Sequence, residues 1–253
     1  MAKIDSLIGK IKQKKELSGI DNSIILEHIE NYLKKTNLIL DNLNESQLKI
    51  IAKDIRAVLR ENVGRFQASA KDRHKLLETN DIPGLLKMHS STKERLEFYP
   101  EFKEIIKKLK VSSILDLGCG INPIALAEPG VKYYAADINL DDLDLVRLFF
   151  KKNNIDGEVF VCNLNKIEDC SLPKTELCLV LKVFDILGKE DYKTAKKIIE
   201  KISSKHLIVS FSTRTLSGKP MNRPRRIWFE KLLESLCYKF EIVKSNNEIF
   251  YII

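Results

Sequence analysis

The sequence predicts an α/β fold in which a mostly parallel sheet ends in an antiparallel hairpin and follows an all-helical segment. The first hundred residues carry apolar side chains at helical spacing. After residue 111, short apolar strands alternate with helical segments, which is the pattern of a parallel sheet covered on both faces. The last residues form two β-like stretches around Ser245-Asn246-Asn247, a composition typical of a hairpin turn.

Two apolar stripes predict the N-terminal helices. The first comprises Ile24, Ile25, His28, Ile29, Tyr32 and Leu33, with Asp21 or Asn22 as the cap. The second comprises Leu48, Ile51, Ala52, Ile55, Val58 and Leu59, after Asn44 or Ser46. We interpret His28, on the first stripe, as a packing residue. Shorter helices are expected over 69–79 and 83–88, and a longer one over 93–109. We therefore expect an all-helical domain over residues 1–92 and an α/β domain over 93–253.

The α/β part has a distinctive order of elements. The expected strands cover 112–117, 131–136, 158–162, 177–182 and 206–211. Helices are expected over 140–152, 190–202 and 226–237, and the final hairpin over 240–244 and 248–253. A parallel sheet that ends in an antiparallel hairpin is the layout of class I methyltransferases, whereas a dinucleotide-binding sheet usually stays parallel.

Length and composition set limits on the class of protein. The 253 residues are 44% hydrophobic, which is enough for a sizeable core. No run of eighteen apolar residues occurs, and the N-terminus lacks the apolar centre of a secretory signal. The five cysteines include no C-x-x-C pair, which indicates neither a disulfide framework nor a zinc site. We expect a cytoplasmic protein with reduced cysteines and no bound metal.

The positive charge is concentrated in the N-terminal part. Residues 1–110 contain 22 Lys and Arg against 16 Asp and Glu, a net charge of +6 out of +8 for the whole chain. Such an excess suggests a polyanion as partner, and a solvated lysine-rich surface is the alternative.

The most informative stretch is VSSILDLGCGINPI, residues 111–124. An apolar strand runs into Asp116 and then Gly118-Cys119-Gly120, and a helix begins near Pro123. Two glycines allow the backbone to turn sharply and approach a ligand closely. A dinucleotide site would add a third glycine, where this chain has Asn122-Pro123. The pattern favours S-adenosylmethionine, which has a ribose and an amino acid but no phosphate. A purely structural strand-to-helix turn is the alternative.

Two further strand ends carry suitable polar groups. Asp137 follows Gly118 by 19 residues, the usual gap for an acid that accepts from ribose hydroxyls. Asn163-Leu164 ends the next strand, where a carbonyl could meet the adenine amino group and an apolar side chain could cover the base. The alternatives are a helix cap for Asp137 and a turn residue for Asn163.

Four stretches carry a resemblance to a known family: MHSSTKERL (88–96), SSILDLGCGINPIALA (112–127), LVLK (179–182) and VSFSTRTLSGKPMNRPRRIWF (209–229). They resemble, in the same order, segments of the aminoglycoside-resistance 16S ribosomal RNA methyltransferases of the Arm/Rmt type, which methylate a decoding-site guanine at N7. The similarity extends from about residue 60 to the C-terminus.

The resemblance implies S-adenosylmethionine as cofactor and the following cofactor contacts: His89, Ser90, Ser91, Arg95, Gly118, Asp137, Asn163, Leu164 and Leu181. Phe66 is a further candidate near the adenosine. An arginine at position 95 suits the carboxylate of methionine, although it could also pair with Glu94 or Glu97 on the surface.

The resemblance also implies a target: 16S rRNA in the 30S subunit, bound through the helical domain by a monomeric enzyme that confers drug resistance. Lys182 and Arg214 match family positions that face the RNA. The acid-free loop 212–228 adds further cations for phosphate contacts: Lys219, Arg223, Arg225 and Arg226.

Guanine N7 has a free lone pair and no proton to lose, so we assign no general base or other catalytic residue. The sequence departs from the family at Asn163, often Asp there, at Phe184-Asp185, where the family has Leu-Pro, and at Gly188. The rival hypotheses are methylation of another RNA position or of a small molecule, and an RNA-binding homologue without activity.

Overall fold

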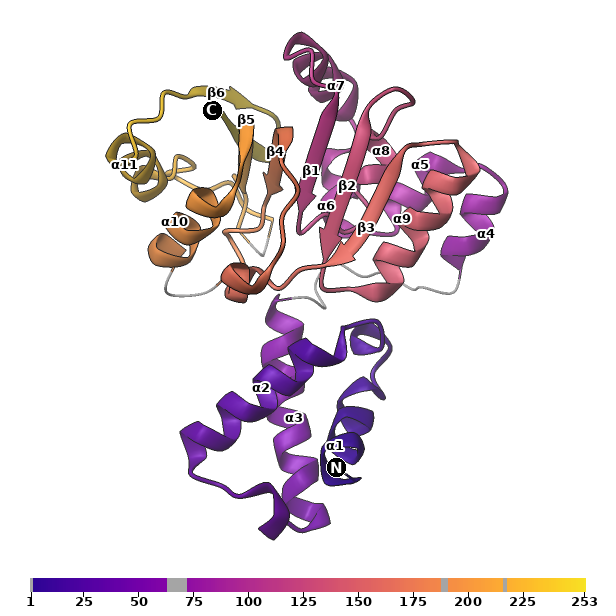
Figure 1. Ribbon diagram of the computed structural model, residues 1–253, viewed down its shortest axis with the longest axis vertical. Coiled ribbons are helices and arrows are strands. Elements are labelled where there is room, and N and C mark those ends of the chain that lie inside the picture. The colour runs from indigo at the N-terminus through magenta and orange to yellow at the C-terminus, as the bar shows by residue number, and fades with distance from the viewer. Residues whose placement is uncertain (1, 63–71, 188–190, 216–217) are drawn as a thin grey trace.

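The computed structural model describes residues 2–62, 72–187, 191–215 and 218–253; Phe66 and Gly188 lie outside this part of the chain. Its centre is a seven-stranded sheet in the order β3-β2-β1-β4-β5-β7-β6 (Figure 1). The parallel strands are β1 (Ser113–Leu117), β2 (Lys132–Asp137), β3 (Gly157–Val161), β4 (Thr175–Leu181) and β5 (Ser204–Ser212). Strands β6 (Glu241–Lys244) and β7 (Glu248–Ile252) form the antiparallel hairpin, and β7 pairs with β5. The predicted fold class is confirmed, and every strand lies within two residues of its predicted range.

The order of the strands reverses between β1 and β4. In an open parallel sheet such a switch leaves a crevice beyond the carboxyl ends of the strands, where ligands bind. The glycine turn follows β1, and Lys182 follows β4, so both lie at this crevice.

Side chains alternate between two apolar clusters, one on each face of the sheet. In β4, Leu177, Leu179 and Leu181 belong to one cluster, whereas Cys178 and Val180 belong to the other. The first face is covered by α4 (Arg73–Glu78), α5 (Ile82–Lys87), α7 (Tyr99–Lys108), α8 (Pro123–Leu126) and α9 (Leu140–Lys152). The second is covered by the 3₁₀ segment η5 (Leu164–Asp169), α10 (Asp191–Lys201) and α11 (Ile227–Ser235).

The prediction of one helix over 93–109 is wrong. The structure has α6 (Ser90–Arg95), a break at residues 96–98, and then α7. Pro100 lies in the first turn of α7, where its missing N–H costs nothing, but it cannot continue a helix that begins earlier. The break directs Arg95 toward the sheet and buries Phe98 against Phe250, with ring centroids 4.8 Å apart.

The N-terminal helices have an apolar core of their own. Helices α1 (Ala2–Lys12), α2 (Asn22–Thr36) and α3 (Glu45–Asn62) surround a cluster of residues between 7 and 59, with the short segments η1 (Lys15–Leu17) and η2 (Leu40–Asn42) between them. Asp21 caps α2 by accepting from the Ser23 amide at 2.8 Å. Asn44 and Gln47 cap α3 reciprocally, each side chain accepting from the other's amide at 2.9 Å.

The boundary between the N-terminal apolar core and the apolar core on the sheet does not coincide with the expected domain boundary at residue 92. Leu77, Leu85 and Leu86 belong to the cluster on the sheet, because α4 packs on α9 and α5 on α8. Helices α4 and α5, expected in the helical domain, therefore belong structurally with the sheet.

The helical bundle lies beyond the carboxyl ends of the parallel strands (Figure 1). The Leu140 amide donates to the Gly19 carbonyl at 2.7 Å, and the Asp21 amide donates to the Ile138 carbonyl at 3.0 Å. A Cβ on Gly19 would lie 2.5 Å from Cγ of Asp141 and 2.6 Å from Oδ1 of Asn139, so a larger residue at this position would have to displace these side chains. The start of α2 is thus fixed next to the crevice. None of the described helices has the length and apolar character needed to cross a membrane.

Candidate functional site

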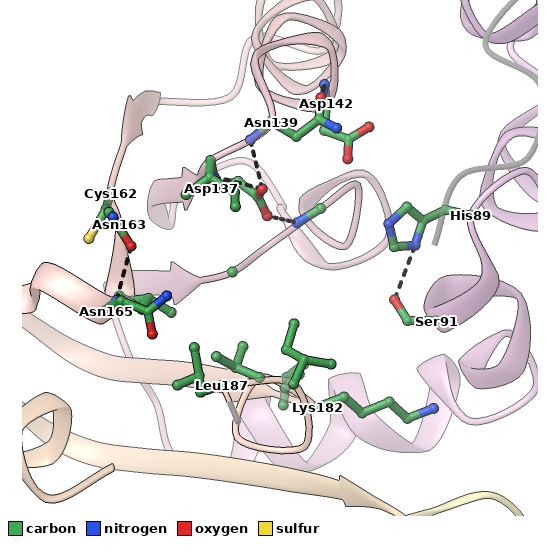
Figure 2. A pocket seen from close by; sticks show the side chains of 17 residues that line it. His89, Ser91, Asp137, Asn139, Asp142, Cys162, Asn163, Asn165, Lys182 and Leu187 are labelled. Atoms are coloured by element: carbon green, nitrogen blue, oxygen red, sulfur yellow. Dashed lines mark hydrogen bonds between the residues drawn. The ribbon is translucent and has the colours of Figure 1, made fainter. Parts of the chain in front are cut away.

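A cavity that is partly open to solvent lies at the carboxyl ends of β1, β2 and β4 (Figure 2). It is lined by His89, Ser91, Gly118, Gly120, Asp137, Ile138, Asn139, Asp142, Cys162, Asn163, Leu164, Asn165, Leu181, Lys182, Val183, Ile186 and Leu187. Most of the predicted cofactor residues are therefore brought together. Ser90 and Arg95 are the exceptions, because neither lines the cavity.

Both glycines of the turn need to be glycine. Gly118 and Gly120 have φ angles of +66° and +50°, in the left-handed region. A Cβ on Gly118 would lie 2.7 Å from Cγ2 of Val183, and one on Gly120 would lie 3.0 Å from Nε2 of His89. The backbone at the cavity wall thus lies so close to Val183 and His89 that a side chain at either position would collide with them.

Asp137 is the carboxylate at the end of β2. Its Oδ2 accepts from the Gly120 amide at 2.8 Å, and its Oδ1 accepts from the amides of Ile138 and Asn139 at 2.7 and 2.9 Å. Burial raises the pKa of Asp137 to about 6, aided by the nearby Asp142 carboxylate and opposed by these three N–H groups. The cap of α9 is Asn139, so the interpretation of Asp137 as the helix cap is wrong.

Asn163 has two roles. Its Oδ1 accepts from the Asn165 amide at 3.0 Å and caps η5, as the turn interpretation expects. Its Nδ2 donates to Oε2 of Glu27 on α2 at 2.5 Å, and the residue also lines the cavity beside Leu164. The helical bundle thereby contacts the cavity wall.

His89 closes the cavity on the side of α6. It is 7% exposed, and its Nδ1 lies 3.1 Å from the hydroxyl oxygen of Ser91. Burial lowers the pKa of His89 to about 4, so the imidazole is neutral at physiological pH.

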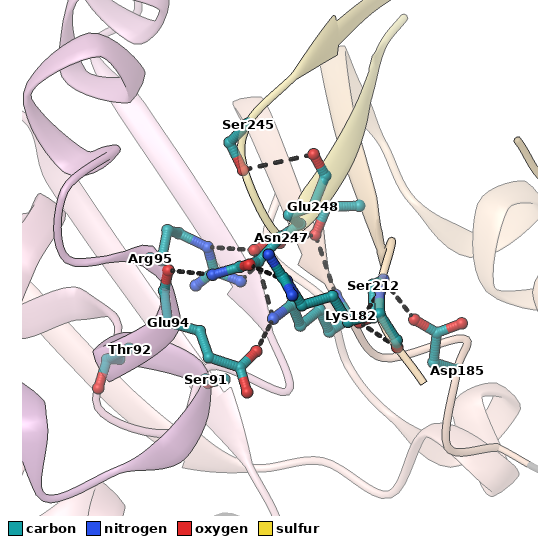
Figure 3. Close-up of polar contacts among 12 residues, drawn as sticks. Ser91, Thr92, Glu94, Arg95, Lys182, Asp185, Ser212, Ser245, Asn247 and Glu248 are labelled. Carbon is teal, nitrogen blue, oxygen red and sulfur yellow. Dashed lines mark hydrogen bonds and ion pairs between the residues drawn. The ribbon is translucent and has the colours of Figure 1, made fainter. Parts of the chain in front are cut away.

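Arg95 is buried in a polar network behind the cavity (Figure 3). Its Nη2 and Nε donate to the two carboxylate oxygens of Glu248 at 2.7 and 3.1 Å, and its Nη1 donates to Oδ1 of Asn122 at 3.1 Å. Burial alone would lower the pKa of Arg95, but the Glu248 charge holds it above its usual value. Arg95 thus pairs with Glu248 at the start of β7, and not with Glu94 or Glu97, the alternative partners considered from the sequence.

The network continues to Asp116, the acid before the glycine turn. Asn122 Nδ2 and the Tyr133 hydroxyl each donate to Asp116 Oδ2 at 2.8 Å, and the Tyr99 hydroxyl donates to Asn122 Oδ1 at 2.8 Å. Asp116 does not line the cavity. Asn122, directly before the place of the missing third glycine, therefore ties the turn to Arg95 and Asp116.

Lys182 has an unusual backbone, with φ +60° in the left-handed region. Its Nζ lies 2.5 Å from Oε2 of Glu94 and 3.6 Å from Oε2 of Glu248. The residue is only 6% exposed and lines the cavity. The residue expected to face the target RNA is thus held between two acids at the cavity wall.

This site lies in a chain that matches the ribosomal RNA methyltransferase (FmrO) family over residues 29–252. The protein belongs to that family. It is 30% identical over 186 residues to a 16S rRNA (guanine(1405)-N(7))-methyltransferase of Serratia marcescens, covering 70% of this chain and 71% of that one. A protein of the same name from Proteus mirabilis is 26% identical over 179 residues, covering 67% of this chain and 63% of the relative.

Solved structures show the same fold. The 16S rRNA methyltransferase RmtF in complex with S-adenosyl-L-homocysteine superposes with a TM-score of 0.80 at 19% identity, covering 100% of this chain and 98% of RmtF. The 16S rRNA methylase ArmA is 28% identical, with a TM-score of 0.56 and coverage of 73% and 98%. The predicted family and the class I methyltransferase fold are confirmed.

The segment 213–226 between β5 and α11 of this methyltransferase is called the cationic loop. Acids outside the loop neutralise part of its positive charge. Arg225 pairs with Glu230 at 2.5 Å, and Arg226 pairs with Asp185 at 3.0 Å. The Arg226 guanidinium is therefore directed at Asp185, and its role in RNA contact stays a prediction. Arg214 donates to Asn247 Oδ1 at 2.6 Å. Lys219 and Arg223 are exposed, and within the described residues no ion pair neutralises them.

Sequence reasoning missed the pairing of Glu94 with Lys182, and it missed Glu248 altogether. Neither lies in a glycine turn or a cationic loop, and Glu248 meets Arg95 across 153 residues of sequence. Only the antiparallel pairing of β7 with β5 brings Glu248 beside Ser210, whose hydroxyl donates to it.

The glycine turn of the methyltransferase gives a test of close packing. We expect Gly118→Ala to lower the free energy of unfolding more than Gly130→Ala, by roughly 1–3 kcal/mol, because its Cβ also meets Val183. Gly130 is the matched control, since it has φ +87° but open space around it. Urea unfolding of both variants measures the difference, and equal losses would contradict the packing argument.

Proposed function

We propose that this methyltransferase transfers the methyl group of S-adenosylmethionine to N7 of a decoding-site guanine in the 16S rRNA of the 30S subunit. The observation that carries the proposal is the single cavity that gathers the glycine turn, Asp137 and Asn163, next to a cationic loop. The names of the relatives supply the base and the atom.

The residues present fit the cofactor. Asp137 holds acceptor capacity at the end of β2 for two ribose hydroxyls, and Asn163 lies at the end of β3 for the adenine amino group. Leu164 and Leu181 supply an apolar wall for the base. Among the described lining residues, Lys182 is the cation that can face the carboxylate of methionine. Ser91 and His89 add polar groups.

Arg95 acts in this proposal as a positioning residue. Through Asn122 it holds the glycine turn, and it shares Glu248 with Lys182. Ser90 is adjacent to the cavity-lining His89 and Ser91, and its role as a cofactor contact stays a prediction.

The reaction requires the protein mainly to place the base relative to the cofactor. The bound cofactor supplies an electrophilic methyl group on a positively charged sulfur. Guanine N7 has a free lone pair, so no side chain needs to remove a proton. The chain's residues hold the base in line with that methyl group and exclude water, and positioning accounts for most of the rate.

The partner in this proposal is the folded small subunit. The helical bundle and the exposed Lys219 and Arg223 contact rRNA phosphates, which orient the enzyme without reading sequence. The enzyme acts as a monomer in the cytoplasm and makes the ribosome resistant to aminoglycosides that bind the decoding site.

We expect tritiated S-adenosylmethionine to label 30S subunits in the presence of the protein. Borohydride and aniline should then cleave the rRNA at one decoding-site guanine, because N7 methylation makes that glycosidic bond labile. The matched control is Asp137→Asn, which should not label. Label on adenine, or on free tRNA in place of 30S subunits, would contradict the proposed target.

A further inference from the structure

Asp185 joins the loop after β4 to the loop after β5. Its Oδ2 accepts from the Ser212 amide at 2.7 Å, and its Oδ1 accepts from Nη2 of Arg226 at 3.0 Å. The same Nη2 donates to the Ser212 carbonyl at 3.0 Å. The three residues close a ring of hydrogen bonds, which we call the 185–226 brace; Figure 3 shows Asp185 beside Ser212.

Arg226 is held on all sides by the protein. Its Nη1 donates to the Pro224 carbonyl at 3.0 Å, and its guanidinium lies 5.3 Å from the centroid of the Phe211 ring. The side chains of Arg226 and Asp185 are 14% and 24% exposed. This partly exposed ion pair is screened less by solvent than a fully exposed one, and the fixed guanidinium makes it directional.

The brace connects the two functional parts of the site. Asp185 lies between Lys182-Val183 and Ile186-Leu187, which line the cavity. Arg226 ends the loop that carries Arg214, Lys219 and Arg223. The position of the cationic loop relative to the cavity therefore depends on this pair.

The other end of the loop has its own anchor. The Thr213 amide donates to the Asn247 carbonyl at 2.9 Å, and Asn247 Oδ1 accepts from Arg214 Nε at 2.6 Å. Asn247 Nδ2 in turn donates to the Glu94 carbonyl on α6 at 3.3 Å. Both ends of the loop are thus fixed to elements of the cavity, while Lys219 and Arg223 project between them.

We propose that Asp185, acting through Arg226, is a positioning residue for the RNA substrate. The brace sets the cationic loop so that a bound RNA presents its target base in line with the methyl donor; this rests on the proposed function. Asp185 touches neither reactant in this account, and it does not line the cofactor cavity.

The test compares Asp185→Asn, Asp185→Glu and wild type in steady-state methylation of 30S subunits. A base held about an ångström out of line reacts far more slowly, so we expect Asp185→Asn to lower kcat/KM for 30S subunits by about 10- to 100-fold. The dissociation constant for S-adenosylhomocysteine should stay within about two-fold of wild type. Asp185→Glu, which keeps the charge, should recover part of the lost activity.

The matched control is Asp144→Asn, which removes an exposed carboxylate paired with Arg147 on α9. It should leave both constants unchanged. An Asp185→Asn variant with wild-type kcat/KM would overturn the proposal. A parallel loss of cofactor binding would also overturn it, because Asp185 would then support the cavity itself.

Hydrogen exchange separates this inference from the proposed function. If the wild-type protein does not methylate 30S subunits, the proposed function fails, but the brace is still judged on the free protein. Faster exchange confined to residues 212–226 in Asp185→Asn supports the brace, and unchanged exchange there overturns it.

Discussion

Asp137→Ala is expected to abolish binding of the cofactor and, with it, all methyl transfer. The carboxylate is the proposed acceptor for both ribose hydroxyls, and hydrogen bonds to a charged group contribute about 1.5–3 kcal/mol each. The variant also leaves the amides of Gly120, Ile138 and Asn139 without their acceptor. We expect the dissociation constant for S-adenosylhomocysteine, measured by calorimetry, to rise by about 100-fold or more.

The control is Asp141→Asn, four residues further along, which removes an exposed carboxylate at the start of α9. It should bind as wild type does. An Asp137→Ala variant with unchanged affinity would show that the ribose lies elsewhere.

The same residue predicts the pH dependence of binding. Because burial raises the pKa of Asp137 to about 6, the carboxylate is ionised above that pH and protonated below it. Affinity should be constant above pH 7 and fall about ten-fold per unit below pH 6. Asp137→Asn should bind weakly at every pH. His89, with a pKa of about 4, stays neutral over this range.

Breaking the Arg95–Glu248 pair should cause the largest loss of stability. Both side chains are 1% exposed, and Glu248 also accepts from Ser210 and lies 3.6 Å from Lys182. Burial alone would raise the pKa of Glu248, but the charges of Arg95 and Lys182 hold it below its usual value. Removing one partner leaves a buried charge uncompensated, which costs about 3–5 kcal/mol.

We therefore expect Glu248→Gln and Arg95→Met each to lower Tm by about 10 °C in calorimetric scans. The double variant Arg95→Met/Glu248→Leu should lose less than the sum, because it leaves no orphan charge at this pair. Glu104→Gln, in an exposed pair with Lys107, is the control and should change Tm little.

The stability measurement also tests the role of Arg95. An Arg95→Met protein with wild-type Tm but no affinity for S-adenosylhomocysteine would place the guanidinium on the cofactor. A lower Tm, together with wild-type affinity for S-adenosylhomocysteine at temperatures below the unfolding transition, supports the positioning role.

The sequence by itself determined the strands, most of the predicted helices and most of the cavity wall. Alternating apolar residues set the strands, helical spacing set α2 and α3, and glycines with positive φ set the turn after β1. These signals are local, because each depends on the backbone and on side chains a few residues apart. Residues at strand ends, such as Asp137 and Asn163, could be placed together because parallel strands end at one edge.

Only the tertiary structure decided which charged side chains pair with each other inside the protein. Arg95 meets Glu248 across 153 residues, Lys182 meets Glu94 across 88, and Arg226 meets Asp185 across 41. No periodicity or spacing connects such pairs, since their distance depends on strand order, on the break before α7 and on the return of β7. Arg95 and Arg226 therefore read as ligand contacts in the sequence, whereas in the structure their guanidinium groups bind Glu248 and Asp185 of the same chain, because burial makes a paired charge far more favourable than an unpaired one.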